Sequence, residues 1–299
     1  MARTENSTRL MTALATMTAA AGAFAWWHRR AVQAADHVFA ARCPAAADGV
    51  ALGAEPIWLI GTSSRAVLLL HGSGDTPQSL RYLADRLHGA GYSVHVPLLP
   101  GHGRSPGAFR QVSAHAYLAA ARAAFDESRA SSVWVGVAGL SMGGALAVQL
   151  AAEVPDVPAL VLLAPYLIPP ATVRRGAALS WIWGLVVPFV AGRGERSMHD
   201  AEAAAAGLAY GIFPPRAVRA LVTTAAHALH ALPRVTAPTL VINSEQDNRI
   251  PAALAIEALR TLRAPSERHW VSGCGHVITA DYCKSAVADL VLTFLARQT

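Results

Sequence analysis

The strongest constraint on this chain is an abrupt change of pattern around Ser141. Residues 133–138 form an apolar run rich in valine, residues 139–143 read G-L-S-M-G, and an Ala/Leu-rich helical pattern follows at once. Glycines two positions before and after a serine suit a sharp strand-to-helix turn, because side chains there would collide with neighbouring elements. We therefore predict a buried strand, a serine in strained backbone and a helix that begins directly after it.

Apolar runs alternate with amphipathic helical patterns along most of the chain. Helical spacing is expected at residues 79–90, 114–128, 251–262 and 280–296. Strands that alternate with helices are typical of a parallel sheet with both faces covered. The runs that we predict as strands are residues 57–60, 66–70, 92–96, 133–138, 159–164, 239–243 and 268–271.

The alternation is interrupted between residues 166 and 235. This segment has no clear strand, has helical patterns at residues 200–209 and 216–229, and carries Trp181, Trp183 and Phe189. Such an insertion is most simply a small helical cap over the edge of the sheet. We predict an α/β fold with a mostly parallel central sheet and helices on both faces. One domain would cover residues 43–299, with the cap insertion at about 166–235, after an N-terminal segment of residues 1–42.

Two side chains downstream of Ser141 are placed where a catalytic serine would need them. A serine hydroxyl is a poor nucleophile near neutral pH, so it requires a base, and the base requires an acid that fixes its tautomer. Asp247 and His276 each follow one of the last two predicted strands, so both lie in loops at the carboxyl edge of the sheet. The order serine, acid, base makes Ser141, Asp247 and His276 the candidate catalytic residues.

Each downstream candidate has rivals. The sequence contains 12 histidines, and His269 lies within a predicted strand, where its side chain should point sideways. Glu245 and Asp281 are the alternative acids. Without a catalytic role, Asp247 would simply cap the helix that begins near residue 251.

Backbone N–H groups near Ser141 are the candidate oxyanion donors. One belongs to Met142, directly after the serine, and the other to Ser73, in the turn H-G-S-G at residues 71–74. The glycines on both sides of Ser73 let the backbone bend toward an acyl oxygen. His71 and His102 are expected to brace these loops through hydrogen bonds rather than to carry protons.

Composition excludes several classes of protein. The chain has 299 residues, of which 53% are hydrophobic, enough to build a sizeable core. The net charge is +6, but the arginines are scattered and no basic block occurs, so nucleic-acid binding is not expected. No metal-ligand spacing such as H-E-x-x-H occurs, and the chemistry of the candidate residues needs no cofactor, so neither a metal nor a cofactor is predicted.

The three cysteines, Cys43, Cys274 and Cys283, are too few for a disulfide framework or a zinc site. Cys274 and Cys283 would pair if the domain faced an oxidising compartment. The favoured interpretation is that both are reduced thiols near the rim of the active site.

Residues 10–27 form an uncharged run that ends in Trp26 and Trp27 and is followed by Arg29 and Arg30. The length lies at the lower limit for a bilayer span, and tryptophans beside arginines resemble an interfacial belt. We expect membrane association through this segment, with the catalytic domain on the cytoplasmic side. A signal peptide cleaved near residues 21–23, which would export the domain, and a soluble extra helix are the alternatives.

Several motifs occur in a fixed order from residue 66 to the C-terminus. They are L-L-L-H-G-S-G from Leu68, P-G-H-G-R-S from Pro100, A-G-L-S-M-G-G from Ala138, A-P-T-L-V-I from Ala237 and G-H-V-I-T from Gly275. In these motifs the sequence resembles the α/β-hydrolase superfamily, and within it the bacterial carboxylesterase and monoacylglycerol-lipase group. The resemblance implies a sheet of about eight strands, Ser141 as nucleophile, His276 as base, Asp247 as acid, and Ser73 and Met142 as oxyanion donors.

A serine hydrolase acting on a small ester is the expected function. The apolar cap favours short-to-medium acyl esters or monoacylglycerols over charged substrates. A prolyl-type peptidase usually needs acidic residues in the cap, and Glu195, Asp200 and Glu202 are the only ones in residues 166–235. A thioesterase or acyltransferase could use the same residues, and a non-catalytic binding module is the alternative outside catalysis. The sequence leaves the natural substrate, the movement of the cap and the oligomeric state open.

Overall fold

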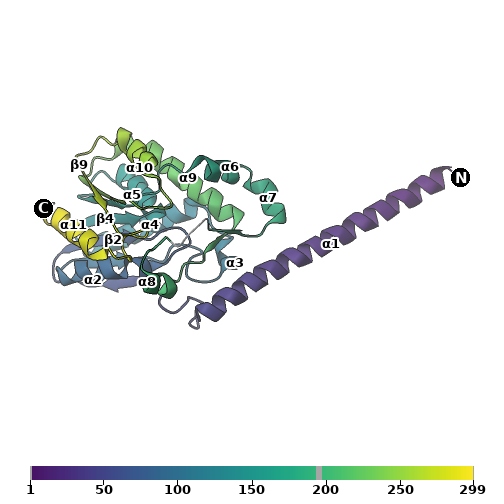
Figure 1. Ribbon diagram of the computed structural model, residues 1–299, viewed down its shortest axis with the longest axis horizontal. Coiled ribbons are helices and arrows are strands. Elements are labelled where there is room, and N and C mark those ends of the chain that lie inside the picture. Colours follow the sequence, from purple (N-terminus) through teal and green to yellow (C-terminus); the bar gives the residue numbers. More distant parts are fainter. Residues whose placement is uncertain (1, 193–196, 299) are drawn as a thin grey trace.

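A seven-stranded sheet forms the centre of the protein. The computed structural model describes residues 2–192 and 197–298 (Figure 1). The strand order is β1-β3-β2-β4-β5-β8-β9, and every neighbouring pair is parallel except the antiparallel pair of β1 and β3 at one edge. The strands are β1 Ile57–Leu59, β2 Arg65–Leu70, β3 Ser93–Val96, β4 Trp134–Leu140, β5 Leu160–Leu163, β8 Thr239–Ser244 and β9 Ser266–Val271.

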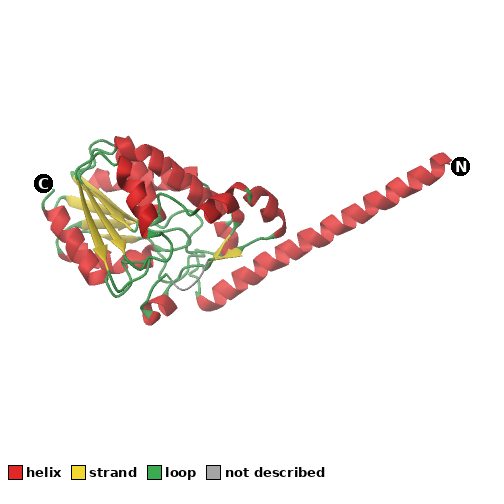
Figure 2. Ribbon diagram, turned by 45° about the horizontal axis from the view of Figure 1, so that its top comes forward, coloured by secondary structure: helices red, strands yellow, loops and turns green. Residues whose placement is uncertain are grey.

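Both faces of the sheet are buried, as the solid apolar runs predict. Along β2, Leu68 and Leu70 enter one apolar core whereas Val67 and Leu69 enter the other, because successive side chains of a strand point to opposite faces. The first core is covered by α4 (Ala114–Ser131), α5 (Met142–Glu153) and α9 (Pro215–Ala231), and the second by α2 (Arg81–Gly89) and α11 (Lys284–Ala296). Figure 2 shows the strands between these helices.

The seven strands observed agree with the expected mostly parallel sheet of about eight, and the segment before β1 adds no strand to the sheet. Residues 43–56 form only an isolated bridge between Ala45 and Ala51. Gly49 and Gly53 turn this segment with positive φ angles of 79° and 89°, which breaks any continuous ladder of hydrogen bonds. The sheet therefore starts at β1.

The segment between β5 and β8 consists mainly of helices. Its elements are α6 (Ala171–Ala178), α7 (Ser180–Val186), β6 (Val190–Ala191), α8 (Ala201–Ala206), β7 (Ile212–Phe213) and α9. The pairing of β6 with β7 was not expected from the sequence, since strands of two residues leave no periodic signal. Ala217, Ala220 and Ala228 of α9 belong to the main core, so α9 is also one of the helices that cover the sheet.

Short helical elements complete the chain. They are α3 (Pro106–Phe109), α10 (Ala252–Ala258) and three 3₁₀ turns at Pro77–Leu80, Leu232–Arg234 and Leu259–Thr261.

The N-terminal helix α1 (Ala2–Arg42) is joined to the domain near its C-terminal end and projects away from it (Figure 1). Phe39 is buried in the main core, 4.9 Å from the ring centroid of Tyr210, and the Asp36 carboxylate accepts a hydrogen bond from the backbone of Gly107 at 2.7 Å. Among the described residues, no helix combines the length and the apolar character needed to cross a bilayer.

Cys274 and Cys283 form a disulfide, with their Cα atoms 5.8 Å apart. The favoured interpretation of two reduced thiols is therefore wrong. The two residues lie at either end of the loop between β9 and α11, and the fold of that loop brings them together. Cys43 is a free, buried thiol.

We predict that the disulfide stabilises the fold measurably. The double variant Cys274→Ala/Cys283→Ala should unfold with a free energy lower by roughly 2–3 kcal/mol, because a bridge over about ten residues restricts the unfolded chain by that amount. Urea unfolding of oxidised wild type and variant measures the difference. A reductant should destabilise the wild type and leave the variant unchanged; equal effects on the two proteins would contradict the prediction.

Candidate active site

Ser141 lies at the apex of a sharp turn between β4 and α5, as the glycine pattern predicts. Its backbone has φ 55° and ψ −114°, a strained conformation for a residue with a side chain. A Cβ atom at Gly139 would overlap the backbone of Gly143, and one at Gly143 would overlap the carbonyl of Leu70. Only glycine at these two positions lets the helix start so close to the strands.

A continuous chain of hydrogen bonds connects Ser141, His276 and Asp247. The Ser141 Oγ atom lies 2.8 Å from His276 Nε2, and His276 Nδ1 lies 2.7 Å from Asp247 Oδ2. The three residues follow β4, β9 and β8, whose carboxyl ends meet at one edge of the sheet. The structure thus brings together the three residues that the sequence singled out.

Asp247 is held in place as a charged acceptor. Its Oδ1 atom accepts hydrogen bonds from the backbone N–H groups of Arg249 at 2.7 Å and Ile250 at 2.9 Å. Burial opposes its ionisation, but the His276 charge, the hydrogen bond to His276 and these two backbone donors together lower the pKa of Asp247 below its ordinary value. Asp247 does not cap α10, whose N-cap residue is Pro251.

The rival residues are not part of this chain of hydrogen bonds. Glu245 is exposed at the surface. The Asp281 carboxylate accepts hydrogen bonds from four backbone N–H groups. His269 lies in β9 with its Nε2 atom 3.9 Å from Glu267.

The two predicted oxyanion donors lie on either side of Ser141 in the fold. Met142 is the first residue of α5, and the first N–H groups of a helix have no partner within the helix. On the other side, a Cβ at Gly72 would lie 3.5 Å from the Cβ of Ser141, so the turn that carries Ser73 passes directly beside the serine. The Ser73 hydroxyl is buried and has no hydrogen-bond partner among the described residues. The donor role of both backbones stays a prediction.

His71 and His102 brace these loops, as expected from the sequence. His71 Nε2 accepts a hydrogen bond from the Leu99 backbone at 3.0 Å, and His102 Nε2 accepts one from the Gly74 backbone at 2.9 Å. Burial lowers the pKa of His102 to about 4, and burial together with the nearby His102 lowers the pKa of His71 well below its ordinary value. Both rings are therefore neutral at physiological pH and suited to accept these bonds.

Asp75 is a half-buried residue beside the site that the sequence did not single out. Its Oδ2 atom would lie 3.8 Å from a Cβ at Gly72, the glycine that faces Ser141, and it accepts a hydrogen bond from Ser79 Oγ at 2.6 Å. Burial raises the pKa of Asp75 to about 6, against the opposing effects of Ser79, the Thr76 backbone and the His276 charge. An aspartate directly after a glycine turn is a common turn residue. No pattern in the sequence therefore indicated that its carboxyl is removed from solvent.

No arrangement for a metal is found in the described part of the chain: residues 2–192 and 197–298 contain no group of three or more His, Cys, Asp or Glu side chains that could hold an ion.

The fold and the site together define an α/β-hydrolase of the serine type. The nearly all-parallel sheet, the serine on a tight turn after β4, and an acid and a base in the loops after β8 and β9 are the features of that class. Residues 61–282 match the Hydrolase_4 family, described as serine aminopeptidase, S33, and the chain belongs to this family.

Individual relatives carry different names. The chain is 27% identical over 248 residues to a thermostable monoacylglycerol lipase from Bacillus sp. (strain H-257), covering 82% of this chain and 95% of the relative. It is 29% identical over 279 residues to the magnesium-chelatase 30 kDa subunit of Rhodobacter capsulatus, covering 78% and 89%. A solved structure from work on the metagenome-derived lipolytic enzymes LipS and LipT superimposes with a TM-score of 0.76 at 30% identity, covering 82% of this chain and 98% of that one.

We predict that Asp75 makes stability depend on pH between about 4 and 6. Because its folded-state pKa of about 6 lies above the ordinary 3.8, the unfolded chain releases this proton first as pH rises. The carboxyl therefore lowers the free energy of unfolding progressively through this window and by a constant amount above it. Asp75→Asn should be more stable than the wild type above pH 6, and the difference should vanish below pH 4.

Chemical unfolding at a series of pH values measures this difference. Asp85→Asn, which changes an exposed carboxyl on α2, is the matched control and should show no such gain. A stability difference for Asp75→Asn that does not change with pH would contradict the assignment.

Proposed function

We propose that this protein hydrolyses carboxylic esters, with Ser141 as nucleophile, His276 as general base and Asp247 as the acid that orients the base. The observation that carries the proposal is the unbroken set of hydrogen bonds from Ser141 Oγ through His276 to Asp247 Oδ2. In this arrangement the imidazole can take the serine proton, and the adjacent carboxylate stabilises the imidazolium that forms.

The reaction would proceed in two acyl-transfer steps. Ser141 Oγ attacks the ester carbonyl while His276 Nε2 takes its proton, and His276 then returns that proton to the leaving alcohol. Water attacks the acyl-enzyme with His276 again as base, which releases the carboxylic acid and restores Ser141. The backbone N–H groups of Met142 and Ser73 are proposed to stabilise the negative oxygen in both steps.

Monoacylglycerols and esters of short to medium acyl chains are the proposed substrates. The cap between β5 and β8 carries exposed apolar side chains on α7, among them Trp181, Ile182 and Leu185. Apolar surface of this kind suits an acyl chain better than a charged group. The names of the monoacylglycerol lipase and of the lipolytic enzymes among the relatives support the same substrate class.

A peptidase is the competing proposal, because the family carries the description of a serine aminopeptidase. Capture of a substrate amino group would require a free carboxylate in the cap. Asp200 uses its carboxylate to cap α8, where Oδ1 accepts from the backbones of Glu202 and Ala203 at 3.0 and 3.1 Å. Glu202 is exposed, and Glu195 lies outside the described residues. Asp200 is thus engaged within the cap, and the names of the lipolytic relatives favour the esterase.

We predict that the protein hydrolyses p-nitrophenyl esters of graded chain length and monoacylglycerols, and that it does not hydrolyse amino-acid anilides. Ser141→Ala should lower kcat by about 10⁴-fold or more, because the nucleophile and its base act as a unit. Initial rates on the ester panel and on an anilide, measured for both proteins, test this. Turnover of the anilide alone would replace the esterase by the peptidase, and full activity of Ser141→Ala would refute both.

We further propose that α1 and α7 rest together on a lipid surface. Burial and the nearby Arg110 lower the pKa of His28 in α1, and the backbone of Gly184 in α7 opposes this, so the two helices lie close together at this point. Many of the exposed large apolar side chains lie on them: Met11, Leu14, Met17, Phe24, Trp26, Trp27, Trp181, Ile182, Leu185 and Val186. Arg29 and Arg30 follow the tryptophans of α1, and Arg174 and Arg175 lie on the neighbouring α6. Apolar side chains flanked by arginines suit an anionic bilayer.

We propose that the catalytic domain lies on the exported side of the membrane. The Cys274–Cys283 disulfide is typical of proteins that face an oxidising compartment. It supports the exported alternative over the cytoplasmic placement that we expected from the sequence.

We predict that the purified protein sediments with vesicles that contain anionic lipid and binds neutral vesicles more weakly. The variant Trp26→Ser/Trp181→Ser should reduce the bound fraction several-fold, because each indole contributes a large apolar area at an interface. Trp58→Ser, which changes an exposed tryptophan on the edge strand β1, away from α1 and α7, is the control. Equal binding by wild type and the double variant would contradict this surface.

A further inference from the structure

One segment of the cap touches the candidate site on both sides. We define residues 197–213, which contain α8 and β7, as the strap. At its C-terminal end, the Tyr210 backbone donates a hydrogen bond to the Gly74 carbonyl at 3.0 Å, and a Cβ at Gly74 would lie 3.1 Å from the Phe213 ring. The strap therefore contacts the turn that carries Ser73.

At its N-terminal end, the strap contacts the loop that carries His276. The Val277 backbone donates a hydrogen bond to the Ser197 carbonyl at 3.0 Å, and a Cβ at Gly275 would lie only 2.5 Å from that same carbonyl oxygen. The residues on either side of His276 are thus packed directly against the strap. Behind them, the disulfide closes the loop between Cys274 and Cys283.

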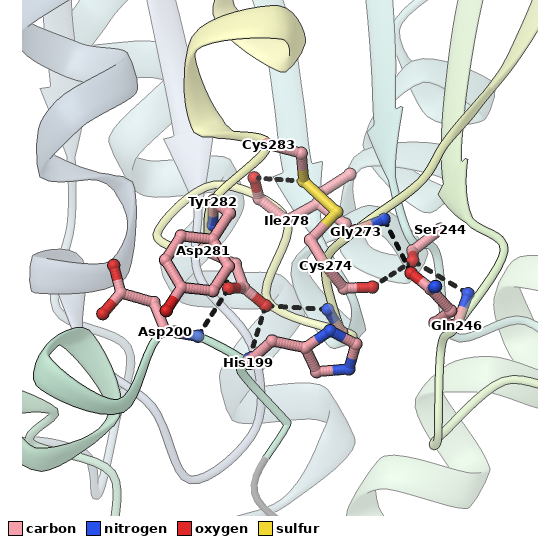
Figure 3. Close-up of a disulfide and its surroundings, with 11 residues drawn as sticks. His199, Asp200, Ser244, Gln246, Gly273, Cys274, Ile278, Asp281, Tyr282 and Cys283 are labelled. Carbon is pink, nitrogen blue, oxygen red and sulfur yellow. Dashed lines mark hydrogen bonds between the residues drawn. A yellow bond between two sulfur atoms is a disulfide. The ribbon is translucent and has the colours of Figure 1, made fainter.

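Asp281 lies at the junction of this loop and the strap (Figure 3). Its side chain is fully buried, and its two oxygens each accept two backbone hydrogen bonds. Oδ2 accepts from Gly275 at 2.7 Å and from His199 at 2.8 Å, and Oδ1 accepts from Asp200 at 2.9 Å and from Tyr282 at 2.8 Å. Two of the four donors belong to the strap, and one immediately precedes His276.

We propose that Asp281 is a positioning residue that fixes the His276 loop to the strap, so that the orientation of the base and the position of the strap against the site form one unit. The inference rests on the proposed role of His276 as base. The hydrogen bonds of the Asp281 carboxylate go to the loop and the strap and not to Ser141, His276 or Asp247. Asp281 therefore acts on the base through Gly275 and the strap.

The charge of this carboxylate is essential to the arrangement. Burial opposes ionisation, but four backbone donors outweigh it and lower the pKa of Asp281. An asparagine has the same shape, yet its amide nitrogen is a donor. In either orientation of the new amide, its nitrogen faces two backbone N–H groups and cannot accept from them. Asp281→Asn therefore loses one pair of hydrogen bonds, either those from Gly275 and His199 or those from Asp200 and Tyr282.

The test is the steady-state kinetics of Asp281→Asn on an ester that the wild type hydrolyses. Loosening the loop should lower kcat by about 10- to 100-fold, because small displacements of a catalytic group are costly. KM should stay within about two-fold, since the variant removes no contact to substrate. Both proteins are assayed at a temperature where circular dichroism shows them folded.

Asp200→Asn is the matched control. It makes the same chemical change on the strap, but asparagine caps a helix as well as aspartate does, so kcat and KM should equal those of the wild type. A loss of kcat in Asp281→Asn alone supports the proposal. If Asp281→Asn keeps the wild-type kcat and only its unfolding temperature falls, Asp281 is merely structural and the proposal is overturned.

Hydrogen exchange of the wild type provides a second test that requires no variant to fold. After correction for their intrinsic exchange rates, the amides of Gly275, His199 and Asp200 should show a common free energy of opening, because the loop and the strap open together. Clearly different opening free energies would overturn the proposal. This measurement is also independent of catalysis: if the protein hydrolyses no ester, the proposed function fails, whereas the exchange rates still decide whether Asp281 joins the two segments.

Discussion

The close approach of α5 to the strands at Ser141 is the contact on which the rest of the site depends. Gly139 and Gly143 permit it, since a side chain at either position would overlap backbone. The approach has two consequences. It forces Ser141 into strained backbone that presents the hydroxyl, and it starts a helix whose first N–H groups lie beside that hydroxyl. The parallel sheet then brings the loops after β8 and β9 to the same edge.

Three aspartates around this edge show how the nearby hydrogen-bond donors set the pKa of a carboxyl that is partly or fully removed from solvent. Asp247 has a histidine and two backbone N–H groups, and its pKa is lowered. Asp281 has four backbone N–H groups, and its pKa is lowered as well. Asp75 has a hydroxyl and one backbone donor, which do not offset burial, and its pKa rises to about 6. The same side chain is thus held ionised beside His276, held ionised between the loop and the strap, or made to keep its proton up to about pH 6.

Local patterns in the sequence predicted the seven strands of the main sheet and the order serine, acid, base. Apolar runs and glycine turns depend on residues that are close together in the chain, so they can be recognised without the fold. The sheet of about eight strands that the resemblance implied is close to the seven observed, and the glycines of residues 43–56 turn the chain before the sheet begins. The strands β6 and β7 were missed because a strand of two residues is too short to show an alternation of apolar and polar side chains. The disulfide was judged wrongly, because nine positions of separation do not reveal how a loop folds.

Local patterns in the chain were enough to predict the class of fold and to single out Ser141, Asp247 and His276, because each follows a predicted strand. What surrounds these three residues became visible only in the folded protein. The burial of Asp75, the four donors around Asp281 and the contact of the strap with both loops join residues far apart in the chain, and such contacts leave no local pattern. They arise from packing across the sheet edge, where distant loops must satisfy one another's polar groups.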